Sequence, residues 1–411
     1  MLRSTASAPY LLALALACAS QACAIARAVG SDCGDEALCR EAALPSTTGP
    51  GGGGTSTTTS RPPKRDGFVR KIDVLFVVND SPATEAQQRA LEQALPDFVL
   101  GLASGDLDGG GTPSFRGVQD LHLGVISGRM GLGNSPAGCA ESFGSEGELT
   151  NVNCLPPNAR FASSQSAGTV PGAAEALKCM VKLGAAGCFP PQPLESALKA
   201  LSPSQMVAGG RTFADGSASG PVENTGFLRP DSLLVVIVVS DVDDCSTNLR
   251  AELANLDPAG LLRRCSVRPE VRFPLDRYVD GLRSLRSGAP DLVMFFALAG
   301  VPRDSVTPEL LEDTPFDRDE EREAFYDQLL ALPPLQPDAL GGSGVQGVAD
   351  GTPPTVCTTP SGPVYPTRRL VELARAFGAN GLVQSLCQEE MGSPLRQILR
   401  SIGRRLGPPR L

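Results

Sequence analysis

The stretch SLLVVIVVSDVDDCS, residues 232–246, decides the fold of this chain. Residues 232–239 form the most apolar run beyond the amino-terminal segment, which is typical of a strand buried on both faces of a sheet. Polar side chains follow at once, beginning with Ser240 and Asp241. Because ligands of parallel sheets bind beyond the carboxyl ends of the strands, residues 240–246 are the first place to look for a site.

Other apolar runs predict further strands of the same sheet, at residues 74–78, 121–126 and 292–298. Helical patterns separate and follow them, at 91–102, 173–183, 194–201, 275–285, 319–330, 367–377 and 394–406. Strands that alternate with helices predict an α/β fold, namely a doubly wound, Rossmann-like, mostly parallel sheet flanked by helices. We expect disulfide-linked loop insertions to interrupt this pattern.

The helix after residues 74–78 has a recognisable start. Ser81 or Thr84 can cap this helix, and Gln87 completes a capping box with Thr84. Pro96 lacks the N–H that an interior helical position requires, so we expect the helix to bend or end near it.

The composition excludes several kinds of site. The chain has 411 residues, a net charge of −9 and a single histidine, His122. One imidazole cannot build a His-rich zinc site, and any Ser-His-Asp or Cys-His catalysis would depend on His122 alone. Because His122 lies inside a strand pattern, we expect an ordinary sheet residue. A net acidic chain without a segregated basic patch predicts no nucleic-acid partner.

The amino terminus predicts export. Residues 1–24 resemble a secretory signal peptide, with a short apolar run at 10–17 followed by small residues. The run Ala15-Leu16-Ala17-Cys18 resembles a bacterial lipobox, which implies lipidation of Cys18, and Cys23 is the second candidate. Plain cleavage beside the Ala-x-Ala at 22–24 is the alternative and leaves a secreted protein.

No later stretch is long and apolar enough to span a bilayer, so the only membrane attachment we expect is a lipid anchor. Residues 25–70, rich in Gly, Ser, Thr and Pro, predict a disordered tether between that anchor and a folded domain at 71–405. We therefore expect an envelope protein, either an outer-membrane lipoprotein or a periplasmic or surface protein.

Ten cysteines lie beyond the predicted signal peptide, an even number that favours disulfides in an exported chain. No close CxxC pair indicates metal-binding thiolates. Pairing each cysteine with its neighbour in sequence is the simplest hypothesis, which gives Cys33–Cys39, Cys139–Cys154, Cys179–Cys188, Cys245–Cys265 and Cys357–Cys387.

The two strand ends carry a family resemblance. Residues 72–78 with the turn 79–84, and residues 233–246 with their Ser-Asp ending, resemble a von Willebrand factor A (VWA) domain of the secreted bacterial kind. Residues 123–127 and 193–198 also match that pattern. The resemblance covers roughly 70–300 well and implies a doubly wound sheet whose site lies at the carboxyl ends of its strands.

In that family a first turn supplies an Asp and two Ser, a second loop supplies a Thr, and the central strand supplies an Asp, and together they hold Mg²⁺. Ser81 and Asp241 match two of these five positions. Asn79 stands in place of the first Asp, with Asp80 beside it, and the remaining departures are Ala83 for the second Ser and Gln192 for the Thr. The resemblance therefore implies a degenerate metal site, for Mg²⁺ or Ca²⁺ if any ion binds. The competing hypothesis is that Ser81 caps a helix and Asp241 forms a turn.

Two functional classes follow, and we expect the non-enzymatic one. The first is an envelope-tethered or secreted binding or adhesion module that recognises protein or another envelope polymer through loops at the carboxyl end of the sheet. The second is a secreted hydrolase that uses carboxylates, with or without metal, from Asp80, Asp241, Asp243 and Asp244. A structural envelope scaffold that has lost its metal is a further alternative. No Gly-x-Ser-x-Gly, His-Glu-x-x-His or phosphate-loop motif supports an enzyme.

Overall fold

The computed structural model describes residues 69–132, 144–151, 153–187, 189–202, 212–213, 215–253, 255–336 and 354–409. All of them belong to one compact unit, Arg65–Leu411. The predicted signal peptide, the candidate lipidation sites Cys18 and Cys23, the Cys33–Cys39 pair and nearly all of the tether lie outside these residues.

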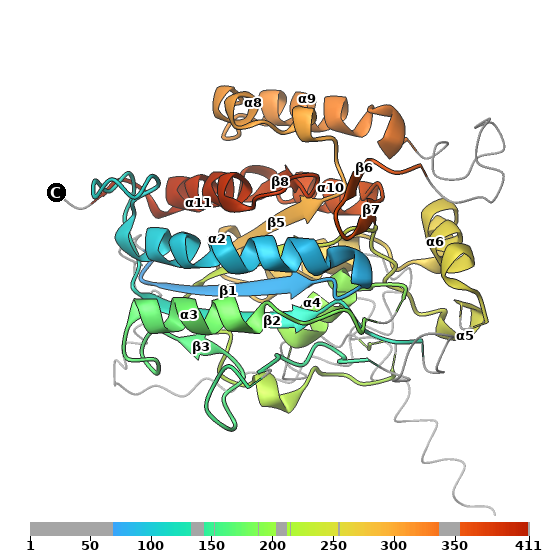
Figure 1. Cartoon of the computed structure of the whole chain (residues 1–411), viewed down its shortest axis with the longest axis horizontal. Helices are drawn as coiled ribbons and strands as arrows, with labels where there is room; N and C mark the ends of the chain where they lie inside the picture. Colours follow the sequence, from blue (N-terminus) through green and yellow to red (C-terminus); the bar gives the residue numbers. More distant parts are fainter. Residues whose placement is uncertain are drawn as a thin grey trace, which may run out of the picture. The chain divides into compact units, whose positions relative to one another are not determined.

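A mostly parallel sheet of six strands forms the centre of the unit (Figure 1), with the order β3-β2-β1-β4-β5-β8. The parallel strands are β1 (Lys71–Val78), β2 (Asp120–Ser127), β4 (Leu233–Val239), β5 (Val293–Ala299) and β8 (Gly381–Ser385), whereas β3 (Ala162–Ser163) is antiparallel to β2. The α/β class and the mostly parallel sheet predicted from the alternating pattern are confirmed. In register, Val78 lies opposite both Ser127 and Val239, so β1, β2 and β4 end at one level.

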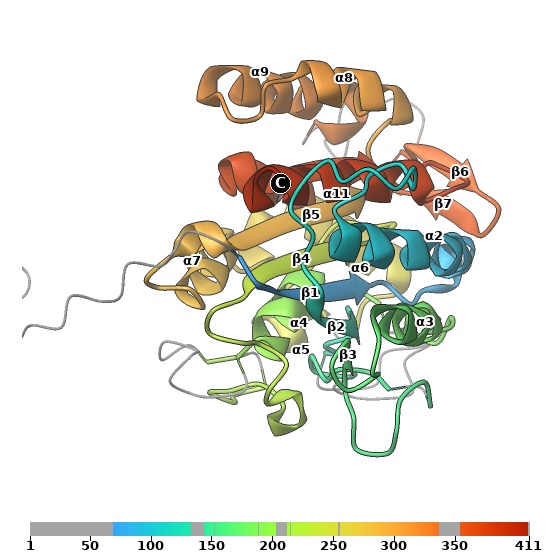
Figure 2. The same cartoon turned by 90° about the vertical axis from the view of Figure 1, so that its left-hand side faces the viewer.

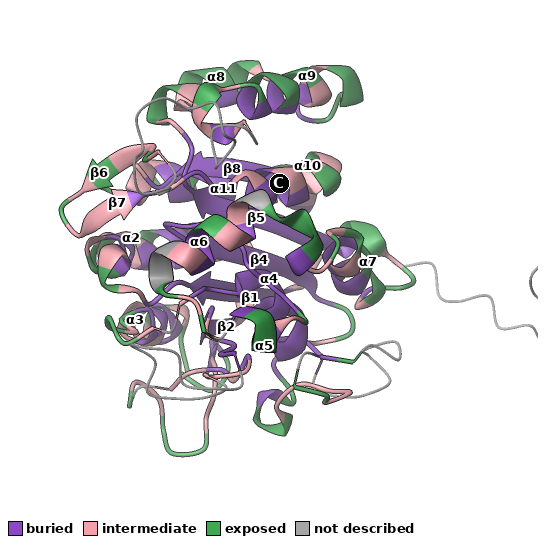
Figure 3. Cartoon of the chain, turned by 90° about the vertical axis from the view of Figure 1, so that its right-hand side faces the viewer, coloured by how far each residue is buried: buried purple, intermediate pink, exposed green. Residues whose placement is uncertain are grey.

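Helices cover both faces of the sheet (Figure 2). One face carries α2 (Glu85–Ser104), α3 (Val170–Met180) and α11 (Gly392–Leu406), and α2 contacts both neighbours. The other face carries α4 (Pro193–Ala200), α7 (Asp276–Ser284) and α10 (Arg368–Ala376). Each β4 residue is therefore buried, as Figure 3 shows for the strands in general. Full burial of both faces explains why β4 reads as a continuous apolar run instead of an alternating one.

Further elements extend this core. Helices α8 (Pro308–Asp313) and α9 (Asp319–Leu330) lie beyond β8, where they contact α11 and α10 respectively. Short helices α5 (Arg250–Leu253) and α6 (Pro258–Val267) follow β4, and β6 (Cys357–Thr359) forms an antiparallel hairpin with β7 (Gly362–Val364). Single 3₁₀ turns are η1 (Pro82–Thr84), η2 (Val222–Asn224), η3 (Pro269–Val271), η4 (Pro290–Leu292), η5 (Arg303–Ser305), η6 (Pro333–Leu335) and η8 (Gly378–Asn380).

The start of α2 differs from the expected capping box. Thr84 is the N-cap residue, but its hydroxyl donates to the carbonyl oxygens of Asn79 (2.6 Å) and Ser81 (2.8 Å) and caps no helical N–H. The Ser81 side chain makes no cap hydrogen bond either. The capping prediction is therefore wrong, because the Thr84 hydroxyl holds the turn after β1 and the Ser81 hydroxyl faces the carboxylate of Asp241.

Helix α2 also continues through Pro96 to Ser104 instead of ending near the proline. A proline inside a helix costs about 3 kcal/mol. Burial of Leu91, Leu95 and Phe98 on either side of it, together with packing against α3 and α11, offsets that cost.

Three disulfides join the described residues, with Cα–Cα separations of 5.7 Å for Cys154–Cys179, 5.5 Å for Cys245–Cys265 and 5.9 Å for Cys357–Cys387. The last two were predicted and are confirmed. The predicted Cys139–Cys154 and Cys179–Cys188 pairs are wrong, because the chain returns through β3 and α3 and brings Cys179 to Cys154. Cys139 and Cys188 themselves lie outside the described residues.

Two predictions concern single features. His122 lies in β2 with its Nδ1 2.8 Å from the carbonyl oxygen of Phe227, and burial lowers the pKa of its imidazole. Among the helices that the structure describes, none has the length and apolar character needed to cross a membrane.

Candidate functional site

Polar residues follow β1 and β4 at the carboxyl edge of the sheet, as the strand pattern predicted. The Asn79 N–H donates to the carbonyl oxygen of Val239 (2.8 Å), so the turn after β1 lies directly beside the end of β4. Asn79, Asp80 and Asp241 are almost completely buried, with 4%, 1% and 2% of their surfaces exposed. These three side chains are therefore closed to solvent, whereas Ser81 is half-buried.

Asn79, Ser81 and Asp241 form one cluster. The side-chain amide of Asn79 donates to Asp241 Oδ1 at 2.5 Å, and the Ser81 hydroxyl lies 3.4 and 3.3 Å from the two carboxylate oxygens. Burial raises the pKa of Asp241 from its ordinary value of 3.8 to about 6, while the hydrogen bonds from Asn79 and Ser81 act in the opposite direction. The structure thus brings together three of the five residues predicted for this site.

Asp80 has a different set of partners. Its Oδ1 accepts a hydrogen bond from the Ser127 hydroxyl (2.8 Å), and its Oδ2 forms an ion pair with Arg129 Nε (2.9 Å). The Gly187 N–H donates to the Asp80 carbonyl oxygen (2.8 Å), and a Cβ on Gly187 would lie only 2.5 Å from Asp80 Oδ1. These contacts tie the ends of β1 and β2 to the loop before α4, so Asp80 does not substitute for the missing aspartate beside Asp241.

Gln192 and Ala83 are likewise occupied elsewhere. The Gln192 amide donates to the carbonyl oxygen of Gly131 (2.9 Å), and its Oε1 accepts from the Thr247 N–H (3.2 Å). Ala83 packs against Gly362 of the β6–β7 hairpin. Its Cβ lies 3.3 Å from the position that a Cβ on Gly362 would occupy. Gln192 therefore links the loops that contain Gly131 and Thr247. Ala83, at the position of the second serine, is in contact with the β6–β7 hairpin.

A divalent cation does not fit this donor set. Mg²⁺ requires six oxygen ligands in near-octahedral geometry, and Asp241 is the only carboxylate in the cluster. The amide of Asn79 points a hydrogen-bond donor at the carboxylate oxygen that would ligate the ion. Within the described ranges, no group of three or more His, Cys, Asp or Glu side chains is arranged to hold a metal.

The β6–β7 hairpin lies beside the cluster, which sequence patterns did not reveal. The Tyr365 N–H donates to the Asp241 carbonyl oxygen at 2.7 Å, and the Ala86 N–H in the first turn of α2 donates to the hydroxyl of Ser361 at 2.6 Å. Figure 1 shows the hairpin against the first turns of α2. Its strands are three residues long and rich in Thr, Pro and Gly, so they give no clear periodic signal.

Asp243 and Asp244 are paired with arginines. Arg369 Nε lies 2.8 Å from Asp244 Oδ2, and the Arg369 backbone N–H donates to both oxygens of Asp243 at 3.1 Å. Burial raises the pKa of Asp243 to about 6, against the attraction of Arg272. These carboxylates connect the loop after β4 to α10.

The insertion after β4 has a small hydrophobic core of its own, separate from the core around the sheet. It consists of Leu132, Cys245, Leu253, Leu261 and Cys265, with Phe189 and Leu256 packed against it. We call this the α5–α6 platform. It joins the loop after β2, the loop before α4 and helices α5 and α6, and the Cys245–Cys265 disulfide runs through it.

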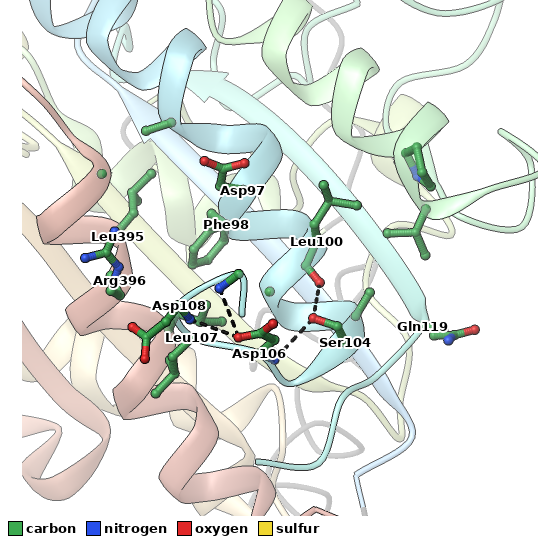
Figure 4. A pocket seen from close by; sticks show the side chains of 18 residues that line it. Asp97, Phe98, Leu100, Ser104, Asp106, Leu107, Asp108, Gln119, Leu395 and Arg396 are labelled. Carbon is green, nitrogen blue, oxygen red and sulfur yellow. Dashed lines mark hydrogen bonds between the residues drawn. The ribbon is translucent and has the colours of Figure 1, made fainter. Parts of the chain in front are cut away.

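A pocket of about 670 Å³ lies away from this edge, between α2, the start of α3 and α11 (Figure 4). Asp106 at its rim accepts hydrogen bonds from the N–H groups of Asp108 (3.0 Å), Gly109 (3.0 Å) and Gly111 (2.5 Å), which lower the pKa of its carboxyl. The carboxylate therefore organises a turn. The rest of the lining combines apolar side chains with polar and charged ones, namely Asp97, Ser104, Asp108, Gln119 and Arg396.

Comparison with family models, curated proteins and solved structures finds no match to this chain.

Proposed function

We propose that this chain is an exported, non-enzymatic binding module related to VWA domains, which recognises a protein or another envelope polymer without a metal ion. The parallel sheet with helices on both faces supports this proposal, as does the grouping of Asn79, Ser81 and Asp241 where the resemblance implies a site. The departures at Asn79 and Ala83 favour metal-independent recognition.

The α5–α6 platform is the observation that carries the proposal. Three loops at the carboxyl edge of the sheet share a hydrophobic cluster, and the Cys245–Cys265 disulfide closes the one that follows β4, so we expect these loops to keep one conformation before a partner arrives. Preorganisation of this kind lowers the entropic cost of association, in addition to stabilising the fold. The platform therefore suits recognition of a large partner.

Two of the four carboxylates that the hydrolase alternative would use, Asp80 and Asp244, are paired with Arg129 and Arg369. The other two, Asp241 and Asp243, are almost completely buried, with 2% and 8% of their surfaces exposed. A general acid or base must reach its substrate directly or through one water. These buried pairings support binding over hydrolysis.

Three arginines lie on or beside α6 of the platform. Arg263 is exposed, Arg264 is half-buried, and Arg268 is exposed and forms an ion pair with Glu270. In a chain with a net charge of −9, such a group would direct an acidic region of the partner to this edge.

The proposal is tested with the mature protein immobilised and exposed to solubilised envelope extract, in Mg²⁺ and in EDTA. We expect the same material to be retained in both buffers. The Arg263→Glu/Arg268→Glu variant should retain roughly tenfold less of it. The control is Arg318→Glu, at an exposed arginine that precedes α9, and this variant should leave retention unchanged. Absence of retained material in both buffers, or retention lost only in EDTA, contradicts the proposal.

Anchoring is part of the same proposal. We infer that lipid at Cys18 or Cys23 attaches the chain to the envelope, with residues 25–70 as tether. The mass of the mature amino terminus distinguishes lipidated Cys18, lipidated Cys23 and simple cleavage, and only the first two are compatible with a lipid anchor.

A further inference from the structure

The Cys357–Cys387 disulfide holds the hairpin that covers the carboxyl edge of the sheet. We propose that it is a thiol–disulfide exchange site, and that its reduction by a dithiol releases the β6–β7 hairpin and uncovers the Asn79–Asp241 pair. The bond joins the first residue of β6 to the segment directly after β8, 30 residues later.

The two strands of the hairpin are attached differently. On the β7 side, Val364 is buried in the main core, Tyr365 donates to the Asp241 carbonyl oxygen, and the Tyr365 carbonyl oxygen lies where a Cβ on Gly300 would be. On the β6 side, only Cys357 packs against the core, and it is half-buried. A two-stranded hairpin of this size is at most marginally stable alone, so the position of β6 depends on the disulfide.

The disulfide is accessible to a reductant. Both cysteines are half-buried and line a pocket of about 410 Å³, which Arg303, Thr359, Glu389 and Glu390 also line. By contrast, Cys245 and Cys265 are 1% and 5% exposed inside the α5–α6 platform. Exchange requires in-line approach of a thiolate to a sulfur, so access should make Cys357–Cys387 the faster of the two to react.

The chemistry needs one dithiol reductant. A thiolate of the reductant attacks one sulfur of the pair, which forms a mixed disulfide and expels the other cysteine as a thiolate. The second thiol of the reductant then attacks the mixed disulfide and frees the first cysteine. The protein gains two electrons and two protons as two thiols, and the reductant leaves as a disulfide.

Release of the hairpin exposes polar groups at the carboxyl edge of the sheet. The Ala86 N–H loses its Ser361 acceptor, the Asp241 carbonyl oxygen loses its Tyr365 donor, and the buried Asn79 and Asp241 side chains gain access to solvent. If the proposed binding function holds, oxidation state would then control access to this part of the binding surface. Hairpin release is measured without any partner, so its failure is separate from a failure of the binding proposal.

Hydrogen exchange of the full chain, oxidised and in dithiothreitol, tests the release directly. In Cys357→Ser/Cys387→Ser we expect exchange at residues 83–87 and 362–366 to rise at least about tenfold, with β4 still protected. Cys154→Ser/Cys179→Ser is the matched control and should leave both segments unchanged. Unchanged exchange in the first variant overturns the proposal, and so does loss of protection throughout β4, which would make the bond a purely structural one.

Alkylation and mass spectrometry during brief dithiothreitol treatment provide the second measurement. We expect Cys357 and Cys387 to be labelled at least about tenfold faster than Cys245 and Cys265 while the protein stays folded. Equal or slower labelling overturns the assignment of an exchange site.

Discussion

The side-chain amide of Asn79 donates a hydrogen bond to the carboxylate of Asp241, a residue 162 positions later in the chain. The contact joins the ends of β1 and β4, where the VWA resemblance implies a cation between two carboxylates. An amide hydrogen bond connects the same two strand ends without an ion. It leaves Asp241 as a buried carboxylate with two neutral partners, Asn79 and Ser81.

The first prediction concerns metal. Millimolar Mg²⁺ or Mn²⁺ should leave the Tm of the wild-type protein unchanged, because one carboxylate and one hydroxyl are too few ligands. Asn79→Asp/Ala83→Ser restores the missing charge and hydroxyl, so it should gain stability with metal, by about 1.4 kcal/mol at ten times the Kd. A Tm series in EDTA and rising Mg²⁺ provides the measurement. A wild-type Tm that rises with metal, and falls back in Asp241→Ala, would contradict this prediction.

The second prediction concerns pH. Burial raises the pKa of Asp241 from 3.8 to about 6, so between these values the folded state binds a proton that the unfolded state lacks. The contribution of Asp241 to stability is therefore full below about pH 4 and declines as the pH rises through 6, by up to about 3 kcal/mol. Asp241→Asn removes this pH dependence. The free energy of unfolding of the variant should therefore rise relative to that of the wild type as the pH rises.

Urea unfolding at pH 4.5 and 7.5 checks this comparison. Asp97→Asn, at an exposed position on α2, is the control and should follow the wild type at both pH values. Parallel behaviour of Asp241→Asn and the wild type would show that Asp241 titrates alike in both states.

The third prediction concerns the buried arginine of α10. Arg369→Ala leaves Asp244 without its charged partner and removes a cation near Asp243, so it should lower the free energy of unfolding by about 3–5 kcal/mol. Arg318→Ala breaks an exposed pair with Glu321 and should cost less than about 1 kcal/mol. Guanidinium unfolding of both variants distinguishes them, and similar losses would mean that the buried network contributes little.

The fourth prediction concerns the α5–α6 platform. Cys245→Ala/Cys265→Ala opens a loop of 20 residues and should lower the free energy of unfolding by about 3 kcal/mol. The variant should also retain less envelope material, because the platform loses its preorganisation. Chemical unfolding and the retention assay test the two effects. Full retention by a measurably destabilised variant would remove the platform from the proposed function.

Much of the sheet follows from local sequence. β1, β2, β4 and β5 are long apolar runs, and their alternation with helices predicts parallel order because a crossover connection returns each strand in the same direction. β8 and β3 escape detection because they are short and polar, and they become strands only by pairing with β5 and β2. Pro96 predicted an early end of α2 for a similar reason. The helix continues because packing against α3 and α11 stabilises it, and local sequence does not show that packing.

In the candidate site, too, some features follow from local sequence and others depend on tertiary contacts. The strand pattern predicted that the residues after β1 and β4 lie at one edge of the sheet, and Asn79, Ser81 and Asp241 do meet there. The contacts of the neighbouring residues became known from the folded chain: Asp80 contacts Ser127 and Arg129, Gln192 joins two loops, and Cys154 pairs with Cys179. The positions of the long strands follow from continuous apolar runs, which a sequence displays. The direction of a loop side chain and the partner of a cysteine depend on contacts between distant segments, which exist only after the chain has folded.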